Sequence, residues 1–416
     1  MPTKKQNLYD VIVIGGGASG MMAAGRAAER GKRVLLLEKN PELGEKLKIS
    51  GGGRCNITNA EEDSHVLLPY YGTAEKFLYS PFSIFGVKQT FEFFTSRGLP
   101  LVIEAHKRAF PATQKALDVF RVLETYLREH AVEIKSSTTI RQIIGANGHI
   151  EKVITDRGEY SAEAFVLSTG GISHPETGST GDGFGFLKQL GFSVETPTPT
   201  LVPIAVRERW VKELSGISID QARVTFFVDG KKKFAVKGRI LFTHFGLSGP
   251  TILNAAGKIS DTLTEGEVTA TIDAFPNTDH GALDKEILDL FEINKNKQLK
   301  TLFKGIAPDG MSEVILSLVS KLDPETKVHS VTKEERKKLV QLMKALPFTV
   351  KGLMGNVLAI VSDGGLSLTQ IDPKSMRTKL YDNLYVTGDL LHIRRPSGGC
   401  SLQLCWTTGF IAGDNV

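Results

Sequence analysis

A short apolar strand that runs directly into a glycine-rich turn constrains the fold of this chain most. Tyr9–Ile14 reads YDVIVI, and the next six residues, Gly15–Gly20, read GGGASG, which fits the pattern G-x-G-x-x-G. The alanine-rich stretch Met21–Arg30 predicts a helix, and the apolar stretch Val34–Leu37 predicts a second strand. A strand, a helix and a strand within about 30 residues form a βαβ unit with a right-handed crossover. The sequence therefore predicts an α/β fold with a parallel sheet.

Three glycines of this turn have separate predicted tasks beside a bound dinucleotide. Gly15 allows the tight turn, Gly17 lets the backbone approach a pyrophosphate, and Gly20 lets the helix pack closely on the strand. The N-terminus of the helix is expected to face the phosphates with its unpaired N–H groups, because the helix dipole favours negative charge there, and Ala18 and Ser19 of the turn are counted among the candidate cofactor-binding residues. The turn therefore predicts a dinucleotide-binding site.

Glu38 follows the second predicted strand, with seventeen residues between it and Gly20. A carboxylate at this position accepts hydrogen bonds from ribose hydroxyls and repels a 2′-phosphate. We therefore count Glu38 and its neighbour Lys39 among the candidate cofactor-binding residues. This motif by itself leaves open whether the dinucleotide is FAD or NAD.

The C-terminal part of the chain favours FAD. The apolar stretch Asn383–Val386 predicts a strand that ends at Thr387–Asp389, a pattern by which many FAD proteins place a carboxylate beside the ribityl chain. Gly398–Gly399 precedes a predicted helix over Cys400–Gly409. A helix N-terminus near the flavin stabilises negative charge on the reduced ring. We therefore predict FAD as the cofactor.

The middle of the chain has a different pattern, in which alternating strands and turn residues precede several helices. Arg223–Val228 and Phe234–Val236 flank Asp229-Gly230 and predict a β-hairpin. The later stretches predict helices, and one of them begins at a capping box; the ranges are Ala282–Phe291, Ser312–Leu322 and Thr332–Leu346. We therefore expect one α/β domain built from residues 1–194 and 357–416, with a β-plus-helix insertion over residues 195–356.

Composition and charge exclude several classes of protein. Lys and Arg number 51 and Asp and Glu 46, which leaves a net charge of +5 over 416 residues, too small to predict a nucleic-acid partner. No apolar stretch reaches the length of about 18 residues that spans a membrane, and the N-terminus reads as no signal peptide. The three cysteines form no C-x-x-C pair, and no His, Cys and Asp cluster has metal-ligand spacing. The sequence therefore predicts a cytoplasmic protein without a metal site, nucleic-acid partner or membrane contact, and leaves the oligomeric state open.

A second glycine cluster follows Glu38 and resembles the signature of a known family. Residues 44–59 read GEKLKISGGGRCNITN. Further matching segments are STGG at 168–171, HPETGSTGDG at 174–183, FTHFGLSGP at 242–250, and the Gly-Gly and Ile-Asp-Pro steps at 364–373. Together these segments resemble the BaiN-like (YhiN) family of bacterial flavoproteins, FAD-dependent enzymes of the aminoacetone-oxidase type. The resemblance extends over the whole chain.

The resemblance implies a glutathione-reductase-like Rossmann FAD-binding domain that is interrupted by an inserted β-barrel and helical domain. It also implies that the Ser50–Asn56 loop lies along FAD, where its N–H groups form an anion-binding nest. Arg54 is expected to contact a phosphate or a flavin oxygen, with ordering of the loop as the alternative. The candidate cofactor-binding residues added in this way are Lys46, Ser50, Gly51, Gly52, Gly53, Arg54, Cys55, Asn56, Thr169, Gly170, Gly388, Asp389 and Gly399.

The chain departs from the family pattern near its C-terminal end. Where the pattern has Gly-Glu, then Asp, then Thr-Gly-Gly-Tyr-Asn, this chain has Gly388-Asp389, His392 and Ser397–Ser401. Asp389 keeps a carboxylate that is one methylene shorter, and a cysteine and a serine replace the ring and the amide. Arg394-Arg395 adds unusual positive charge to the same segment.

The function expected of this chain is that of an FAD-dependent oxidoreductase acting on a small organic substrate. Reduction of an enone-type double bond and oxidation of an aminoketone are both open, as is a flavin-binding sensor or RNA-associated protein with incidental redox activity. No second strand–G-x-G-x-x-G–helix pattern is present, so NAD(P)H is expected to dock only transiently as an electron donor. His174, His244 and His392 lie in glycine-flanked motifs and are the candidate catalytic acids or bases, with structural hydrogen bonding as the alternative role.

Overall fold

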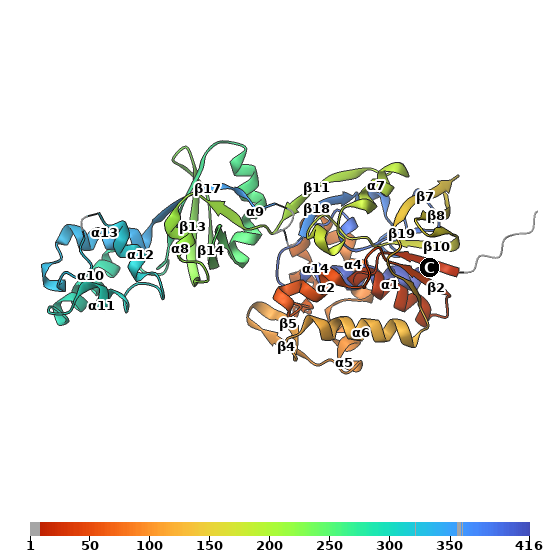
Figure 1. Cartoon of the computed structure of the whole chain (residues 1–416), viewed down its shortest axis with the longest axis horizontal. Helices are drawn as coiled ribbons and strands as arrows, with labels where there is room; N and C mark the ends of the chain where they lie inside the picture. The colour runs from red at the N-terminus through yellow and green to blue at the C-terminus, as the bar shows by residue number, and fades with distance from the viewer. Residues whose placement is uncertain (1–8, 321, 356–358, 360) are drawn as a thin grey trace, which may run out of the picture. The chain divides into compact units, whose positions relative to one another are not determined.

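The computed structural model describes residues 9–320, 322–355, 359 and 361–416. The chain divides into two compact units, one made of Met1–Pro199 and Ala359–Val416, the other of Thr200–Leu358 (Figure 1). The first predicted domain boundary, at residues 194–195, falls inside strand β11 (Val194–Thr200), and the second, at 356–357, lies outside the described residues. Segments from both ends of the chain thus build the first unit.

The first unit is built around a five-stranded sheet in the order β19-β10-β1-β2-β6, in which every pair of neighbours is parallel. The strands are β1 (Tyr9–Ile14), β2 (Val34–Leu37), β6 (Glu133–Lys135), β10 (Ala162–Leu167) and β19 (Leu384–Val386). β1 and β2 have the predicted bounds and are almost wholly buried, as expected of parallel strands that are covered on both faces. The predicted α/β fold with a parallel Rossmann-type sheet is confirmed.

Two helices from opposite ends of the chain pack against each other beside this sheet. α1 (Ala18–Glu29) begins three residues before the predicted start, and α14 (Cys400–Asn415) continues past the predicted end at Gly409. A Cβ atom on Gly409 or Gly413 would lie 2.4 Å from a carbonyl oxygen of α1. Glycine therefore does not end α14, because its missing side chain is what allows the two backbones to approach and the helix to bury its surface.

The remaining elements of the first unit surround the sheet. An antiparallel meander joins β6 to β10, and a second small antiparallel sheet has the order β3-β5-β4, while β11 pairs with β18. The strands are β3 (Thr58–Asn59), β4 (Leu101–Glu104), β5 (Arg108–Pro111), β7 (Ile140–Ala146), β8 (His149–Thr155), β9 (Gly158–Tyr160) and β18 (Val361–Leu366). The helices are α2 (Glu45–Ile49), α3 (Ser64–Leu67), α4 (Glu75–Ile84), α5 (Val87–Ser96), α6 (Ala116–Glu129) and α7 (Asp182–Gln189).

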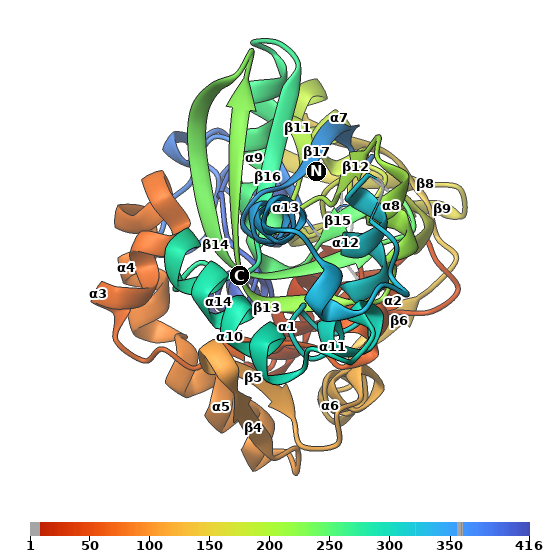
Figure 2. The same cartoon turned by 90° about the vertical axis from the view of Figure 1, so that its left-hand side faces the viewer.

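The second unit contains a closed six-stranded barrel in the order β12-β15-β14-β13-β16-β17. Its strands are β12 (Ile204–Val206), β13 (Ser218–Val228), β14 (Lys231–Thr243), β15 (Gly246–Ser248), β16 (Val268–Asp273) and β17 (Leu346–Leu353). The predicted hairpin is confirmed: Val228 pairs with Lys231 across Asp229-Gly230, and β13 and β14 form the long arrows of the barrel in Figure 2. Alternate residues such as Phe226 are buried inside it, as the two-residue period of a strand requires.

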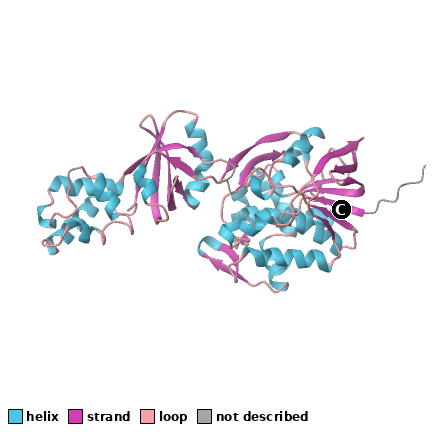
Figure 3. Ribbon diagram, viewed as in Figure 1, coloured by secondary structure: helices cyan, strands magenta, loops and turns pink. Residues whose placement is uncertain are grey.

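The helices from α10 to α13 form a group of their own within the second unit, whereas α8 and α9 lie against the barrel strands (Figure 1, and the cyan ribbons of Figure 3). Two predicted helix ends were wrong: α12 ends at Leu318 instead of Leu322, and α13 ends at Lys344 because Leu346 pairs with Ile272 as part of β17. The predicted capping box is confirmed, since Thr332 and Glu335 each accept the other's backbone N–H. The helices are α8 (Arg209–Glu213), α9 (Pro250–Leu263), α10 (His280–Ile293), α11 (Leu299–Phe303), α12 (Ser312–Leu318) and α13 (Lys333–Lys344).

Candidate functional site

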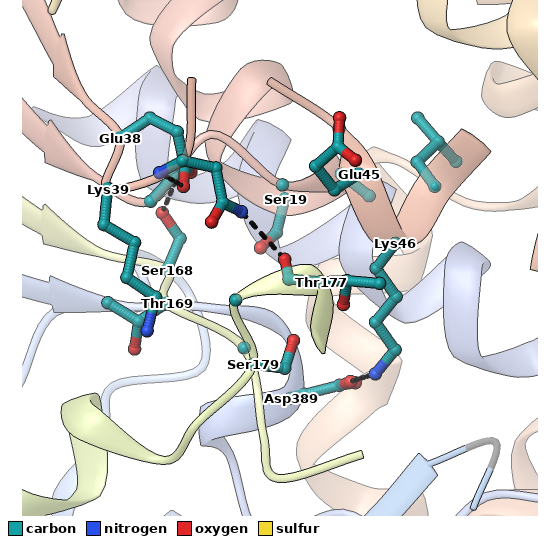
Figure 4. A pocket seen from close by; sticks show the side chains of 18 of the residues that line it. Ser19, Glu38, Lys39, Glu45, Lys46, Ser168, Thr169, Thr177, Ser179 and Asp389 are labelled. Atoms are coloured by element: carbon teal, nitrogen blue, oxygen red, sulfur yellow. Dashed lines mark hydrogen bonds and ion pairs between the residues drawn. The ribbon is translucent and has the colours of Figure 1, made fainter. Parts of the chain in front are cut away.

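A pocket lies where the strands of the parallel sheet end, within the first unit (Figure 4). Its walls come from the turns after β1, β2 and β10, from α2, and from Asp389 and α14 near the C-terminus. The carboxyl edge of an open α/β sheet is the general location of ligand sites in such folds. Of the predicted cofactor-binding residues, those that line the pocket are Gly15, Gly17, Ala18, Ser19, Glu38, Lys39, Lys46, Ser50, Thr169, Gly170 and Asp389.

The glycine turn has the geometry that its three predicted tasks require. Gly15 has a φ of +101°, and a Cβ atom there would lie 2.6 Å from the carbonyl oxygen of Ser168. A Cβ atom on Gly20 would lie 1.9 Å from the carbonyl oxygen of Gly15, so this position must be glycine for the helix to pack on the strand. A Cβ atom on Gly17 would meet no protein atom within 4 Å. The space beside Gly17 therefore belongs to the pocket.

Glu38 is fixed by the backbone of the two turns it joins. Its carboxylate accepts the N–H of Gly16 at 2.7 Å and the N–H of Asn40 at 2.8 Å. Burial raises the pKa of Glu38, and the two backbone hydrogen bonds lower it. Because the effect of burial is larger, the pKa of Glu38 lies above its ordinary value. The remaining lone pairs of the carboxylate are available to ribose hydroxyls, because each carboxylate oxygen accepts more than one hydrogen bond.

Lys39 ties the end of β2 to the start of α7. Its ammonium group lies 2.6 Å from Asp182 and donates to Thr180 at 2.5 Å. Burial raises the pKa of Asp182, but the hydrogen bonds from Lys39 and Thr180 outweigh it and leave the pKa below its ordinary value. Lys39 lines the pocket, but its charge is already paired with this carboxylate.

At the other end of the pocket, Lys46 and Asp389 face each other (Figure 4). The Lys46 ammonium lies 3.4 Å from Asp389 Oδ2 and donates to Ser173 Oγ at 2.5 Å. The other oxygen of Asp389, Oδ1, accepts from the buried guanidinium of Arg395. Burial raises the pKa of Asp389, but the charges of Arg395 and Lys46 outweigh it and hold the pKa below its ordinary value. Asp389 is therefore an anion in a buried setting.

Thr169 lines the pocket and carries a polar atom without a partner. Its hydroxyl oxygen is buried and has no hydrogen-bond partner among the described residues. A buried hydroxyl without a partner is costly. A ligand with polar groups along its length, such as FAD, would satisfy it. The space beside Gly17, the start of α1, Glu38 and Asp389 provide the donors and acceptors that a dinucleotide needs, so the residues present fit FAD.

Most of the glycine-rich loop after α2 lies outside the pocket lining. Ser50 lines the pocket, whereas Gly51, Gly52 and Gly53 have positive φ angles and are exposed. Arg54 donates to Gln114 at 2.6 Å, pairs with Glu104, and lies over the ring of Phe110 at 4.1 Å from its centroid. These contacts correspond to the loop-ordering alternative for Arg54, and the predicted cofactor contact stays a prediction.

The other predicted residues outside the lining hold neighbouring segments together. Burial raises the pKa of the Cys55 thiol to about 12, so the thiol stays protonated. With the oxygen and nitrogen of its side-chain amide exchanged, so that both find hydrogen-bond partners, Asn56 accepts the N–H of Gly399 at 2.9 Å. A Cβ atom on Gly399 would lie 2.2 Å from the backbone of Thr58, and one on Gly388 would lie 2.7 Å from the hydroxyl of Ser19. These glycines therefore permit close packing behind the pocket wall.

The three candidate histidines are not among the residues that line the pocket. His174 has a φ of +55° and its Nδ1 lies 2.8 Å from Glu176, while His392 is exposed on the segment after β19. His244 lies in the turn between β14 and β15 of the second unit, where its ring contacts Phe245 edge to face. Their catalytic roles stay predictions.

Several pocket residues escaped the sequence prediction. Ser168, Asn40, Thr177, Ser179, Asp182, Ser401 and Cys405 line the pocket, and Arg395 lies behind it. The glycine-rich segment at 174–183 was a usable signal for three of them, because it had already been singled out. The residues next to Cys405 in the sequence give no sign that it lines a pocket; it does so because α14 packs there. Burial raises the pKa of its thiol to about 12, so the thiol stays protonated.

No group of three or more His, Cys, Asp and Glu side chains among the described residues is placed to hold a metal ion. No described helix combines the length and the apolar surface needed to cross a membrane.

Comparison with known proteins confirms the resemblance seen in the sequence. The HI0933-like protein Rossmann domain matches residues 9–415. A 3-dehydro-bile acid delta(4,6)-reductase of Clostridium scindens is 27% identical over 96% of this chain and 97% of its own length. A ribosomal RNA dihydrouridine synthase of Haemophilus influenzae is 26% identical over 96% of this chain and 96% of its own length. The structure of a 3-ketosteroid-delta4-(5alpha)-dehydrogenase from Rhodococcus jostii superposes with a TM-score of 0.56 at 14% identity, covering all of this chain and 98% of the other, and shares its fold.

Proposed function

As a member of the HI0933-like Rossmann family, this chain is an FAD-dependent oxidoreductase, and we propose that it reduces a carbon–carbon double bond conjugated to a carbonyl group. The observation that carries the proposal is the pocket of the first unit, which offers a dinucleotide turn at Gly15–Gly20, an unsatisfied hydroxyl at Thr169 and a charged end at Lys46 and Asp389. This arrangement suits a flavin cofactor, and the residues around the cofactor would determine which substrate binds.

The names of the two full-length relatives describe one kind of reaction. A 3-dehydro bile acid carries an oxo group next to the double bonds that a delta(4,6)-reductase saturates. Dihydrouridine is uridine whose ring double bond, next to a carbonyl, has been saturated. Saturation of a double bond conjugated to a carbonyl adds the equivalent of one hydride and one proton across the conjugated system. This shared chemistry supports the enone-type reduction over the oxidation of an aminoketone.

The protein residues of the pocket bind and orient, whereas FAD when bound supplies the hydride chemistry. The N–H groups at the start of α1 and the space beside Gly17 would hold the pyrophosphate, and Glu38 the ribose. Thr169 and Asp389 would hydrogen-bond the middle of the cofactor. Lys46 is the pocket cation nearest to Asp389, and it would favour a substrate or cofactor group that gains negative charge.

NAD(P)H is the proposed electron donor, docking only for the transfer. The sequence has a single strand–G-x-G-x-x-G–helix segment, which FAD would occupy. Anaerobic addition of NADH or NADPH to the FAD-loaded protein should therefore bleach the visible absorption of the flavin. A steroid-type enone should then restore the absorption in proportion to the enone reduced. Protein that binds FAD, accepts electrons and is reoxidised by no conjugated carbonyl compound contradicts the proposed reaction.

Uracil in RNA is the second candidate substrate, which the relative from Haemophilus influenzae favours. The same reduced protein is incubated with a uridine-containing ribosomal RNA, and dihydrouridine is measured by mass spectrometry of the digested RNA. Formation of dihydrouridine without reduction of the steroid-type enone would identify uracil in RNA as the substrate whose double bond is reduced. The matched control is Gly17→Val, which is expected to lack FAD and to reduce neither substrate.

A further inference from the structure

The atypical segment after β19 places a buried arginine behind the pocket. The side chain of Arg395 is 0% exposed. Its guanidinium pairs with Asp389 Oδ1, donates to the carbonyl of Ile393 at 2.5 Å, and lies 3.3 Å from the hydroxyl of Ser401. A fully buried guanidinium needs a counter-ion and hydrogen-bond acceptors, and Asp389 is its ion-pair partner.

Asp389 is shared between two cations, each of which lies at a different carboxylate oxygen. Arg395 pairs with Oδ1. Lys46, which lines the pocket, lies 3.4 Å from Oδ2 (Figure 4). Lys46 is 27% exposed and lines the pocket, whereas Arg395 does not line it. The carboxylate thus has one oxygen committed to the arginine and the other turned toward the ligand space.

We propose that Arg395 is a positioning residue that fixes Asp389 as an anion with Oδ2 directed at the FAD, an inference that rests on the proposed function. The shorter side chain of Asp389, where the family pattern has Glu, cannot reach as far into the pocket. The guanidinium of Arg395 presents several N–H donors in a fixed plane. It therefore sets the direction of the Asp389 carboxylate and keeps this carboxylate ionised. Arg395 does so without contact to the cofactor.

The charged and titratable groups around Asp389 support this assignment. Those that act on the Asp389–Arg395 pair are Lys46 of α2, Cys400 and Cys405 of α14, and Tyr71. Burial raises the pKa of both thiols to about 12 and raises that of Tyr71, so these groups stay neutral. Among these described groups, Arg395 and Lys46 are the ones that keep Asp389 charged where burial favours the protonated acid.

The test measures FAD affinity as a function of pH on refolding-competent apoprotein, using the change in flavin fluorescence on binding. Asp389 stays ionised in the wild type, whereas Glu38 of the same pocket has a pKa that burial raises, so the dissociation constant of each variant is compared with that of the wild type at the same pH. Arg395→Met should raise the dissociation constant roughly tenfold over the wild type at neutral pH and by a larger factor as the pH falls, since a charge-assisted hydrogen bond is lost when Asp389 takes up a proton. Arg395→Lys should restore most of the affinity and the wild-type pH profile.

The matched control is Arg394→Met. Arg394 stands next in the chain, is 74% exposed and pairs with Asp363 instead of Asp389. Its removal should leave the dissociation constant and the pH profile unchanged. An Arg395→Met protein that is folded, by its thermal transition, and has the wild-type affinity and pH profile overturns the inference.

A double variant keeps the test decisive if Arg395→Met alone does not fold. Asp389→Asn and the combined Arg395→Met/Asp389→Asn are compared, and the combined variant leaves no buried charge unpaired between them. If Arg395 acts through Asp389, both variants bind FAD equally weakly. A further tenfold loss in the combined variant overturns the positioning role. Wild-type protein that binds no FAD contradicts the proposed function instead.

Discussion

The carboxylate of Glu38 accepts the backbone N–H of Gly16 at 2.7 Å. This bond ties the acid at the end of β2 to the glycine turn at the end of β1, so that the predicted ribose acceptor and the predicted phosphate turn form one rigid edge of the pocket. Asn40 donates to the same carboxylate at 2.8 Å. The edge is thus organised by backbone donors before any cofactor binds, which lowers the entropy that binding must overcome.

Gly17→Val should abolish FAD retention and leave the protein folded. A Cβ atom at this position would meet no atom of the described residues within 4 Å, so the added side chain begins in the space predicted for the pyrophosphate. The flavin-to-protein ratio after purification and the thermal transition of the apoprotein measure the two effects. The control is Gly20→Val, whose Cβ would lie 1.9 Å from a carbonyl oxygen and which should lose the fold itself. A Gly17→Val protein that keeps FAD would show that the cofactor lies elsewhere.

Thr169→Val should weaken FAD binding by about fivefold, the value of one typical hydrogen bond of roughly 1 kcal/mol. The hydroxyl has no hydrogen-bond partner among the described residues, so its removal should not lower the free energy of unfolding of the apoprotein. The comparison is Thr408→Val, because Thr408 accepts the N–H of Gly388 at 3.0 Å and donates to Leu404 at 2.7 Å. Titration of apoprotein with FAD and urea unfolding separate the two. Loss of stability in Thr169→Val would contradict the assignment.

The stability of the apoprotein should depend on pH through Glu38. Burial raises the pKa of this carboxyl in the folded state, so the folded protein holds the proton more tightly than the unfolded chain. The contribution of Glu38 is therefore fully present below its ordinary pKa of about 4.3 and is lost as the pH rises through the raised value.

Glu38→Gln removes this titration. The free energy of unfolding of the wild type minus that of the variant, from urea unfolding between about pH 4 and about pH 7, should fall as the pH rises. A difference that is constant over this range, or that grows with pH, would mean that the folded state does not hold the proton as its burial requires.

Thr332→Ala should destabilise the helical part of the second unit by about 1 kcal/mol. Thr332 accepts the N–H of Glu335 at 3.2 Å, and Glu335 accepts the N–H of Thr332 at 2.8 Å, so the variant leaves one N–H at the start of α13 without its acceptor. Hydrogen exchange of the first turn of α13 measures the local effect. Unchanged exchange there would show that tertiary packing, and not the cap, holds this end of the helix.

The local patterns of the sequence were enough to predict the segments whose interactions join near neighbours. β1, β2, the hairpin at Asp229-Gly230 and the capping box at Thr332 were all found where they were expected. Each depends on a periodicity, a turn residue or a hydrogen bond that spans a few residues, and such information is complete within the segment. The glycine turn and Glu38 belong to the same class, which is why the sequence could predict that they lie together at one edge of the pocket.

The tertiary structure alone decided the other end of the pocket and the surroundings of the glycine-rich loop. Lys46 meets Asp389 across 343 residues of sequence, and Arg54 meets Gln114 across 60. α14 continues past its predicted end because its glycines let it pack closely on α1. This could not be read locally, because α1 lies at the opposite end of the chain. The sequence showed Arg395 only as unusual positive charge near the C-terminal end, and the fold buries it against Asp389. Local sequence determines which groups are available, but the free energy of burial, which decides which of them meet, depends on residues that are adjacent only in the folded chain.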